Sequence, residues 1–156
     1  MISMRAGFMP RPGVSIRVFH FLLTAVLILA CEPRYFTEYA ADHPQEEEVK
    51  SALIAFESAW NIHNEPALLD LLDDDFIFWV WSGGNRRIVF RKGAFGFKLR
   101  DIFIHWRYLE FGKPDILIKN NLATAHVAVI VDGKSFHSTF RFIKRGDEWL
   151  VLELEM

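Results

Sequence analysis

The chain has 156 residues, of which 51% are hydrophobic, and it carries 18 Lys and Arg against 20 Asp and Glu, a net charge of −2 at pH 7. This length fits one domain, and the charge balance excludes a protein that binds nucleic acid through excess positive charge. Its single cysteine excludes an intrachain disulfide, so the core must hold the fold.

The first 30 residues have the pattern of an export signal. Arg5, Arg11 and Arg17 are their only charged residues, and they precede an apolar run of about a dozen residues, 18–29, that is followed by the small residue Ala30. This order is typical of a secretory signal peptide. The run is shorter than the ~20 apolar residues that a membrane-spanning helix needs. We therefore expect residues 1–30 to be a cleaved signal peptide.

The end of this run, LILAC at residues 27–31, resembles the lipobox of bacterial lipoproteins, with Ile28 where that family most often has Leu. The resemblance implies that Cys31 is acylated and becomes the first mature residue. Its lipid would anchor the protein in the cell envelope, on the periplasmic side or at the cell surface. The alternatives are an uncleaved signal anchor, or a later start at Met4 or Met9 with Cys31 as an ordinary buried thiol.

Removal of residues 1–30, which carry three Arg and no acidic residue, leaves a net charge of −5 from 15 basic and 20 acidic residues. We expect no nucleic-acid partner for so acidic a domain. Residues 31–45 contain two prolines and show no periodicity, which predicts a lipidated tether before the domain. Tyr35, Phe36 and Tyr39 would dock on the domain or sit at the membrane interface.

Three helices are predicted in the domain that follows. Apolar residues recur at three- and four-residue spacing over residues 46–63, which indicates an amphipathic helix. Asn64 fits the cap of a second helix over residues 65–72, and the aspartates at 73–75 then fit a solvated turn. A third helix is predicted over residues 92–103.

The rest of the chain predicts strands, because β-branched and aromatic residues gather between Gly-, Asn- and Asp-containing turns. The expected strands are residues 76–81, 87–90, 105–111, 115–119, 123–131, 134–144 and 148–155. This order of elements indicates an α+β domain over residues 46–156, with three helices packed on one face of a curved antiparallel sheet.

At this point the chain resembles the nuclear transport factor 2-like superfamily, in particular its small bacterial SnoaL-like and DUF4440-like members. The residues that carry the resemblance are Trp60, Asn64, 68–72 with 74–76, 91–93, 121–125 and 147–149. They are spread over residues 46–156 and include no catalytic signature. The resemblance implies a cone-shaped sheet wrapped on helices, a pocket at its open end, and often a homodimer.

A tight two-residue turn is predicted at residues 132–133, where Asp-Gly separates two apolar runs. It places Val131 opposite Lys134 and thereby fixes every pair along both strands. His126 and His137 then become diagonal neighbours on the polar, convex face. They lack a third ligand, so we expect a solvated or dimer-facing surface, with no metal and no cofactor.

The register of the last strand leaves two alternatives. An even-numbered loop after Lys144 places Trp149, Val151, Glu153 and Glu155 on the concave face, whereas an odd loop places the leucines there. A carboxylate in an aromatic cavity would have a raised pKa and could act as acid or base. The candidate catalytic residues are therefore Glu155 and Glu153, with Tyr108 as hydrogen-bond donor.

Large aromatic side chains are the candidates for lining a pocket. A Trp-lined cavity with few polar groups suits an apolar or ring-bearing small molecule. The alternative is ordinary packing in the core. The expected ligand-binding residues are Trp60, Trp79, Trp81 and Phe140, and the remaining candidates are His63, Trp106 and Tyr108.

Three functional hypotheses compete. The first is an envelope lipoprotein, attached to the membrane by its lipid, that binds a small apolar ligand or a partner protein. The second is an isomerase-, dehydratase- or cyclase-type enzyme that uses a pocket carboxylate, as members of the superfamily do. The third is an accessory protein that assembles through its sheet, as a homodimer or with a partner. A carboxylate or histidine inside the cavity, within hydrogen-bond reach of a second polar group, is the feature that separates the second from the first.

Overall fold

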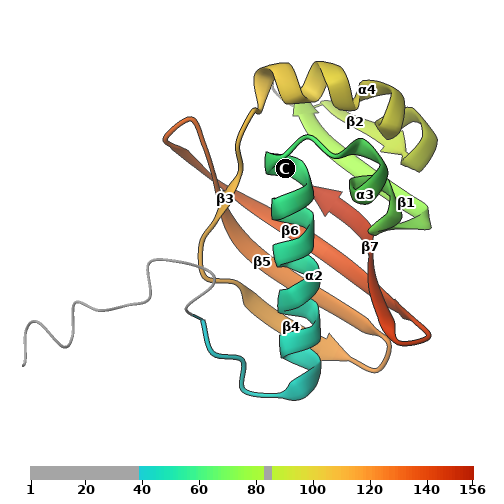
Figure 1. The fold of residues 1–156 in the computed structure, drawn as a ribbon, viewed down its shortest axis with the longest axis vertical. Helices are drawn as coiled ribbons and strands as arrows, with labels where there is room; N and C mark the ends of the chain where they lie inside the picture. The colour runs from blue at the N-terminus through green and yellow to red at the C-terminus, as the bar shows by residue number, and fades with distance from the viewer. Residues whose placement is uncertain (1–38, 83–85) are drawn as a thin grey trace, which may run out of the picture. The chain divides into compact units, whose positions relative to one another are not determined.

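In the described residues, three helices pack on one face of a seven-stranded sheet (Figure 1). The computed structural model describes residues 39–82 and 86–156, so the predicted signal peptide, Cys31 and most of the tether lie outside it. The helices are α2 (Pro44–Asn61), α3 (Glu65–Asp70) and α4 (Lys92–His105). The strands are β1 (Leu72–Ser82), β2 (Arg86–Arg91), β3 (Glu110–Phe111), β4 (Asp115–Lys119), β5 (Leu122–Val131), β6 (Lys134–Arg145) and β7 (Glu148–Glu155). None of these helices has the length and apolar character that crossing a membrane requires.

Helix α2 lies across the sheet and packs on it through one apolar stripe. Val49, Leu53, Phe56 and Trp60 follow at helical spacing and are all fully buried. After α2 ends, the Asn64 side chain accepts a hydrogen bond from the third residue of α3 at 3.2 Å. The predicted first helix and the predicted cap are confirmed, with shifts of one or two residues at the helix ends.

The sheet has the strand order β2-β1-β7-β6-β5-β3, with β4 also paired to β5 (Figure 1). Neighbouring strands are antiparallel except β1 and β7, which run parallel. The α+β class is confirmed, but the sheet is mixed where a purely antiparallel one was expected. A hairpin enforces antiparallel pairing only between consecutive strands, and the whole middle of the domain separates β1 from β7.

The β5–β6 hairpin has the register that the sequence predicts. Val131 pairs with Lys134, and the pairing continues without a shift through all ten residues of β5. Asp132 and Gly133 form the turn with φ angles of 49° and 75°, the left-handed conformation that a tight type I′ turn requires. The local turn chemistry was therefore sufficient to align both strands.

Strand β7 combines the two predicted registers. Trp149 and Val151 are buried on the helix-covered face, as the even-loop alternative requires. Further along the strand, however, Leu154 is fully buried. Glu153 and Glu155, which the same alternative places on that face, lie on the opposite one.

A β-bulge at Leu152 accounts for this change. Phe142 of β6 pairs with Val151, but the preceding residue, Arg141, pairs with Glu153, so Leu152 is an extra residue in β7. Because side chains alternate between faces, one extra residue inverts every later position. The bulge therefore turns a leucine into the core and both glutamates out of it.

Strand β1 begins earlier than predicted and includes the three aspartates that were expected in a solvated turn. Asp73 is only 3% exposed. Its carboxylate accepts hydrogen bonds from Arg145, the nearer at 2.9 Å, and from the amide of Asp75 at 3.0 Å. The Arg145 guanidinium holds the pKa of Asp73 below its ordinary value. The expectation is wrong for Asp73, because a cation distant in the sequence compensates its burial.

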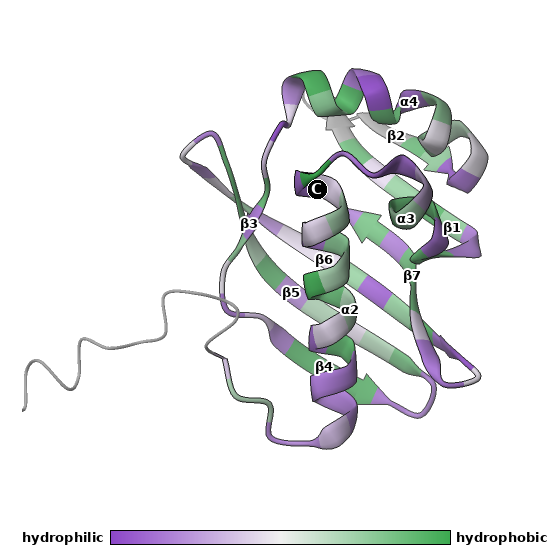
Figure 2. Cartoon of the chain, viewed as in Figure 1, coloured by the Kyte–Doolittle hydropathy of each residue, from purple (hydrophilic) through white to green (hydrophobic). Residues whose placement is uncertain are grey.

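The core between helices and sheet is largely aromatic. Strands alternate between hydrophobic and hydrophilic residues, and the first turns of α2 are hydrophilic (Figure 2). Phe56 of α2 packs edge-on against Phe140 of β6, with ring centroids 5.2 Å apart, and Phe111 packs on the same ring at 5.4 Å. Such edge-to-face pairs add to the stabilisation by buried area.

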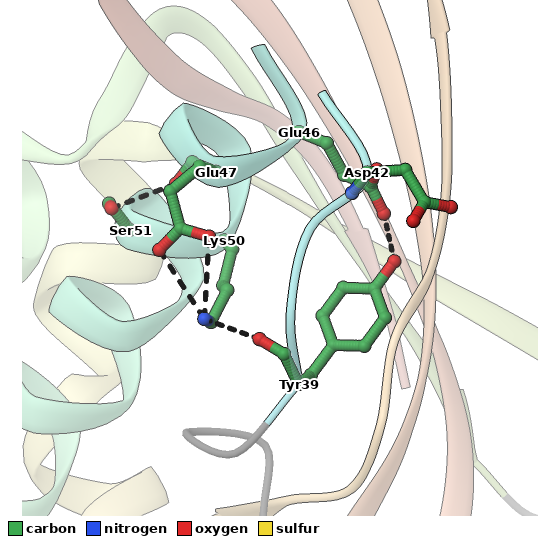
Figure 3. A network of polar contacts seen from close by, with 6 residues as sticks. All are labelled: Tyr39, Asp42, Glu46, Glu47, Lys50 and Ser51. Carbon is green, nitrogen blue, oxygen red and sulfur yellow. Dashed lines mark hydrogen bonds and ion pairs between the residues drawn. The ribbon is translucent and has the colours of Figure 1, made fainter. Parts of the chain in front are cut away.

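The residues before α2 fold back on its first turns (Figure 3). The Tyr39 hydroxyl donates to the Glu46 carboxylate, which also accepts from the Asp42 amide at 2.9 Å. Lys50 donates to the Tyr39 carbonyl oxygen at 2.5 Å and lies 3.3 Å from the Glu47 carboxylate. We call the group formed by Tyr39, Glu46 and Lys50 the tether lock. Its two opposite charges, the Glu46 carboxylate and the Lys50 ammonium, belong to buried residues. The tether lock fixes the point at which the tether reaches the domain.

Candidate functional site

A cavity of about 320 Å³ lies at one end of the sheet. The segment after α4, the β5–β6 turn and the end of β7 come together there (Figure 1). Its volume lies in the range of small-molecule sites, about 300–1,000 Å³. The described residues that line it are Val80, Trp106, Val131, Phe136, His137 and Met156.

Strand alternation places most of the lining side chains. On β1, Val80 is two residues beyond the buried Phe78 and shares its face. On β6, Phe136 shares a face with the buried Phe140 and is 48% exposed at the cavity. Met156 lies two residues beyond the buried leucine of β7. The cavity is thus a continuation of the core face, left uncovered where α2 ends.

The backbone at Trp106 is held by α2. The Trp60 indole nitrogen donates to the Trp106 carbonyl oxygen at 2.9 Å. Phe103, from the last turn of α4, packs edge-on against the Trp60 ring at 5.3 Å. Because Trp60 is fully buried, its indole gives this wall of the cavity a fixed attachment to the core.

The chain beyond Trp106 is also bound by side chains of α2. The Asn61 amide group both accepts from and donates to the Leu109 backbone, each bond at 2.8 Å. Glu57 accepts from the Phe111 amide at 2.8 Å. The strand predicted over residues 105–111 is therefore wrong except for Glu110–Phe111, because helix side chains take the place of a neighbouring strand.

Glu57 is a half-buried carboxylate in this attachment. Burial raises its pKa, the bond from the Phe111 amide opposes that shift, and the nearby Glu110 adds to it. Glu57 is not among the residues that line the cavity. Its role is that of a backbone acceptor, which holds the pocket-side segment on α2.

The aromatic residues expected to bind a ligand are placed differently. Trp60 and Phe140 are fully buried in the core behind the cavity. Trp79 lies on the other face of β1, beside Glu155 of β7. The side chain of Trp81 lies outside the described part of the chain. Among the described side chains, Trp106 is the expected pocket candidate that lines the cavity.

The candidate catalytic residues are not brought together. Glu153 forms an ion pair with Arg141 at 2.8 Å on the face of the sheet away from the helices. Glu155 pairs with Thr139 on that same face. Tyr108 is 60% exposed, and its ring centroid lies 6.5 Å from that of His63. Among the described residues, no Asp or Glu lines the cavity.

Sequence reasoning missed five lining residues, Val80, Val131, Phe136, His137 and Met156. Of these, His137 was expected on a solvated or dimer-facing surface. A usable signal existed for two of them, because the predicted hairpin register already puts Val131 and Phe136 on the concave face. The turn at residues 132–133 marks the end of the sheet, where no helix continues the cover. A concave apolar position next to such a turn is therefore a better pocket indicator than aromatic size.

On the outer face of the sheet, Leu122 of β5, Ile143 of β6 and Leu150 of β7 pair in one row, and Leu117 of β4 lies on the same face next to this row. The strongly exposed apolar residues of this face are Leu117 and Leu122, and Val89 on β2 at the opposite edge. His126 lies beside Thr139, with Nδ1 3.2 Å from the hydroxyl. No group of three His, Cys, Asp or Glu suited to a metal occurs in the part of the chain that the structure describes.

No protein-family model matches this sequence, and no curated protein matches it significantly. Solved structures match the fold. An NTF2-like protein of unknown function from Shewanella baltica has a TM-score of 0.63 at 11% identity, covering 75% of this chain and 95% of that one. An NTF2-like protein from Cytophaga hutchinsonii has a TM-score of 0.62 at 16% identity, covering 72% and 97%.

A protein of unknown function with a cystatin-like fold from Nostoc punctiforme is also similar, with a TM-score of 0.59 at 11% identity, covering 72% of this chain and 90% of that one. At such identities the likeness concerns the fold alone. The domain has the nuclear transport factor 2-like (NTF2-like) fold, as the resemblance in the sequence implied.

Proposed function

We propose that this NTF2-like domain binds a small, mostly apolar molecule in the cavity between Trp106, Phe136 and Met156. The observation that carries the proposal is the composition of the wall: apolar side chains dominate it, and no described carboxylate reaches it. Such a cavity favours burial of an apolar molecule. Acid–base catalysis would need a carboxylate or a histidine there, within hydrogen-bond reach of a second polar group. His137 lines the cavity, but no second acidic or basic side chain lines it among the described residues, so binding is the better supported of the two functions.

The fluorescent probe N-phenyl-1-naphthylamine tests this function, because its emission rises when an apolar site takes it up. The wild-type protein should enhance the emission saturably. Phe136→Asp places a charge in the cavity wall and should weaken binding at least tenfold, since burying an unpaired charge is strongly unfavourable.

Val89→Asp is the matched control. Val89 and Phe136 are both 48% exposed apolar residues of the sheet, but Val89 lies on β2 away from the cavity. This variant should bind the probe like the wild type. The proposal is rejected if the wild type gives no saturable enhancement, or if both variants lose binding equally.

We further propose that the domain is held at the membrane of the cell envelope by a lipid on Cys31. The support is the basic and apolar leader with its lipobox-like end at residues 27–31. The tether lock adds that the domain begins only seven residues, 32–38, after the lipidated cysteine. Mass spectrometry of the native protein should find a mature N-terminus at Cys31 that carries acyl mass. An unmodified start at a methionine would contradict the anchor.

A further inference from the structure

Ser138 is the polar residue on the helix-covered face of β6 between Phe136 and Phe142, which is otherwise apolar. Its side chain points to the helix-covered face, between Phe136, which lines the cavity, and Phe140, which is in the core. Opposite it on β5 is the buried Val127. Ser138 itself is 2% exposed. A hydroxyl is thus enclosed by apolar side chains at the boundary between core and cavity.

The Ser138 hydroxyl has no hydrogen-bond partner in the described part of the chain, and it is the one buried side-chain polar atom there of which this is true. Buried polar groups in native proteins are paired in the great majority of cases. An unpaired one costs stability. Its presence therefore needs a reason that the core alone does not supply.

The strand register places Ser138 next to residues that line the cavity, although Ser138 itself is not one of the lining residues. Thr139 pairs with Glu155, and one further step of the same antiparallel register sets Ser138 opposite Met156. Met156 and Phe136 both line the cavity. Ser138 is therefore flanked by cavity wall both across the sheet and along its own strand.

We infer that Ser138 is a ligand-binding residue of this cavity, and that the ligand is a neutral, ring-bearing apolar molecule with one carbonyl or hydroxyl oxygen. The inference rests on the proposed function. A serine hydroxyl pairs with either kind of oxygen, since it both donates and accepts. The His137 imidazole is the one strongly polar side chain among the described lining residues, and no Lys, Arg, Asp or Glu lines the cavity. A charged group would therefore enter without one of these side chains to balance its charge, which favours a neutral ligand.

A small movement of the Met156 or Phe136 side chain exposes the hydroxyl to the ligand. Phe136 is 48% exposed and Met156 is only partly buried, so neither side chain is fixed by full packing. The ligand oxygen would then satisfy the group that is unpaired in the empty protein. Selectivity follows because an analogue without the oxygen leaves the hydroxyl unpaired.

The test compares 1-indanone with indane, which has the same ring system without the oxygen. Each displaces N-phenyl-1-naphthylamine from the wild type and from Ser138→Ala. In Ser138→Ala the affinity for 1-indanone should fall roughly fivefold, the usual effect of one hydrogen bond. The affinity for indane should stay the same or rise.

The melting temperature of Ser138→Ala distinguishes a ligand-binding role of Ser138 from a structural one. Removing an unpaired hydroxyl should leave the melting temperature of the empty protein unchanged or higher. A clear decrease would show that the fold itself uses the hydroxyl, and would overturn the inference. Equal changes in affinity for both ligands would also overturn it. If neither ligand displaces the probe, or the probe does not bind, the proposed function has failed first.

Discussion

Asp73 and Ser138 are both buried polar residues, and they differ in what surrounds them. The Asp73 carboxylate faces the Arg145 guanidinium, which balances its charge. The Ser138 hydroxyl faces apolar side chains. The first arrangement stabilises the domain by itself, whereas the second is complete only with a bound molecule. At the scale of single residues, pairing therefore separates structural polar groups from candidate functional ones.

We expect Asp73→Asn to lower the free energy of unfolding by about 1 kcal/mol at pH 7, since the amide loses a charge-assisted bond to Arg145 that is half open to solvent. Glu153→Gln is the matched control. Glu153 faces Arg141, which lies on β6 like Arg145, but this pair is more exposed to solvent. The loss of unfolding free energy in Glu153→Gln should therefore be smaller. Urea denaturation of both variants measures the difference, and equal effects would contradict the prediction.

The effect of Asp73→Asn should also depend on pH. The pKa of Asp73 in the folded protein is below the value of about 3.9 for an unfolded chain. The stabilisation is therefore fully present above pH 4 or so and is lost as the pH falls through the folded-state pKa. Urea unfolding curves measured from about pH 6 to about pH 3 should show that the unfolding free energies of the wild type and the variant become more similar as the pH falls. A constant difference would argue against the ion pair.

Among the elements, the side-chain orientation of β7 is set by the bulge at Leu152, which the local sequence pattern does not show. Leu152 and Leu154 have the same parity in the sequence, so an unbroken strand would bury both or neither. The bulge separates them: Leu154 is fully buried and Leu152 only partly. Leu154→Ala should cost about 2–5 kcal/mol of unfolding free energy, and Leu152→Ala distinctly less. Similar costs for the two variants would mean that the strand has no bulge.

The segment between α4 and β3 depends on α2 in place of a strand partner. Asn61→Ala leaves the amide and carbonyl of Leu109 unpaired, although Leu109 is only 2% exposed. We expect a loss of about 2–3 kcal/mol in unfolding free energy. Because this segment carries Trp106, binding of N-phenyl-1-naphthylamine should weaken as well. The control Asn64→Ala removes only the cap of α3. It should lower the unfolding free energy by about 1 kcal/mol and leave binding of the probe unchanged.

These elements also show how far the sequence predicts the structure. The β5–β6 register was predictable because Asp132-Gly133 encodes its turn locally. The Asp73–Arg145 pair and the Asn61–Leu109 bonds were not, since their partners lie far apart in the chain. The bulge at Leu152 was not either, since the side-chain pattern of β7 is compatible with either face. The candidate site was predicted least well, because a cavity forms where the packing of the core ends, and the sequence pattern does not show that position. Of its aromatic candidates, Trp60 and Phe140 lie in the core and Trp79 on the outer face, and among the described side chains Trp106 is the one that lines the cavity.

At the scale of the whole molecule, α2 separates the tether lock, at its first turns, from the cavity, near its last turn. Tyr39 is bound to the first turns of α2, and Trp60 near its last turn holds Trp106. A helix of 18 residues is about 27 Å long, so the two sites lie well apart in the domain. Seven tether residues span at most about 25 Å. A lipid on Cys31 would therefore keep the locked end close to the membrane.

Depth-dependent quenching tests this arrangement in the lipidated protein. A fluorophore on Lys113→Cys, whose native ammonium lies 5.6 Å from the Tyr39 ring, should be quenched strongly by doxyl lipids in vesicles. The same fluorophore on Asp132→Cys, at the turn beside the cavity, should be quenched less. The non-lipidated Cys31→Ser forms of both variants serve as controls and should show little quenching. Equal quenching at both positions, or stronger quenching at Asp132, would contradict a cavity held away from the bilayer.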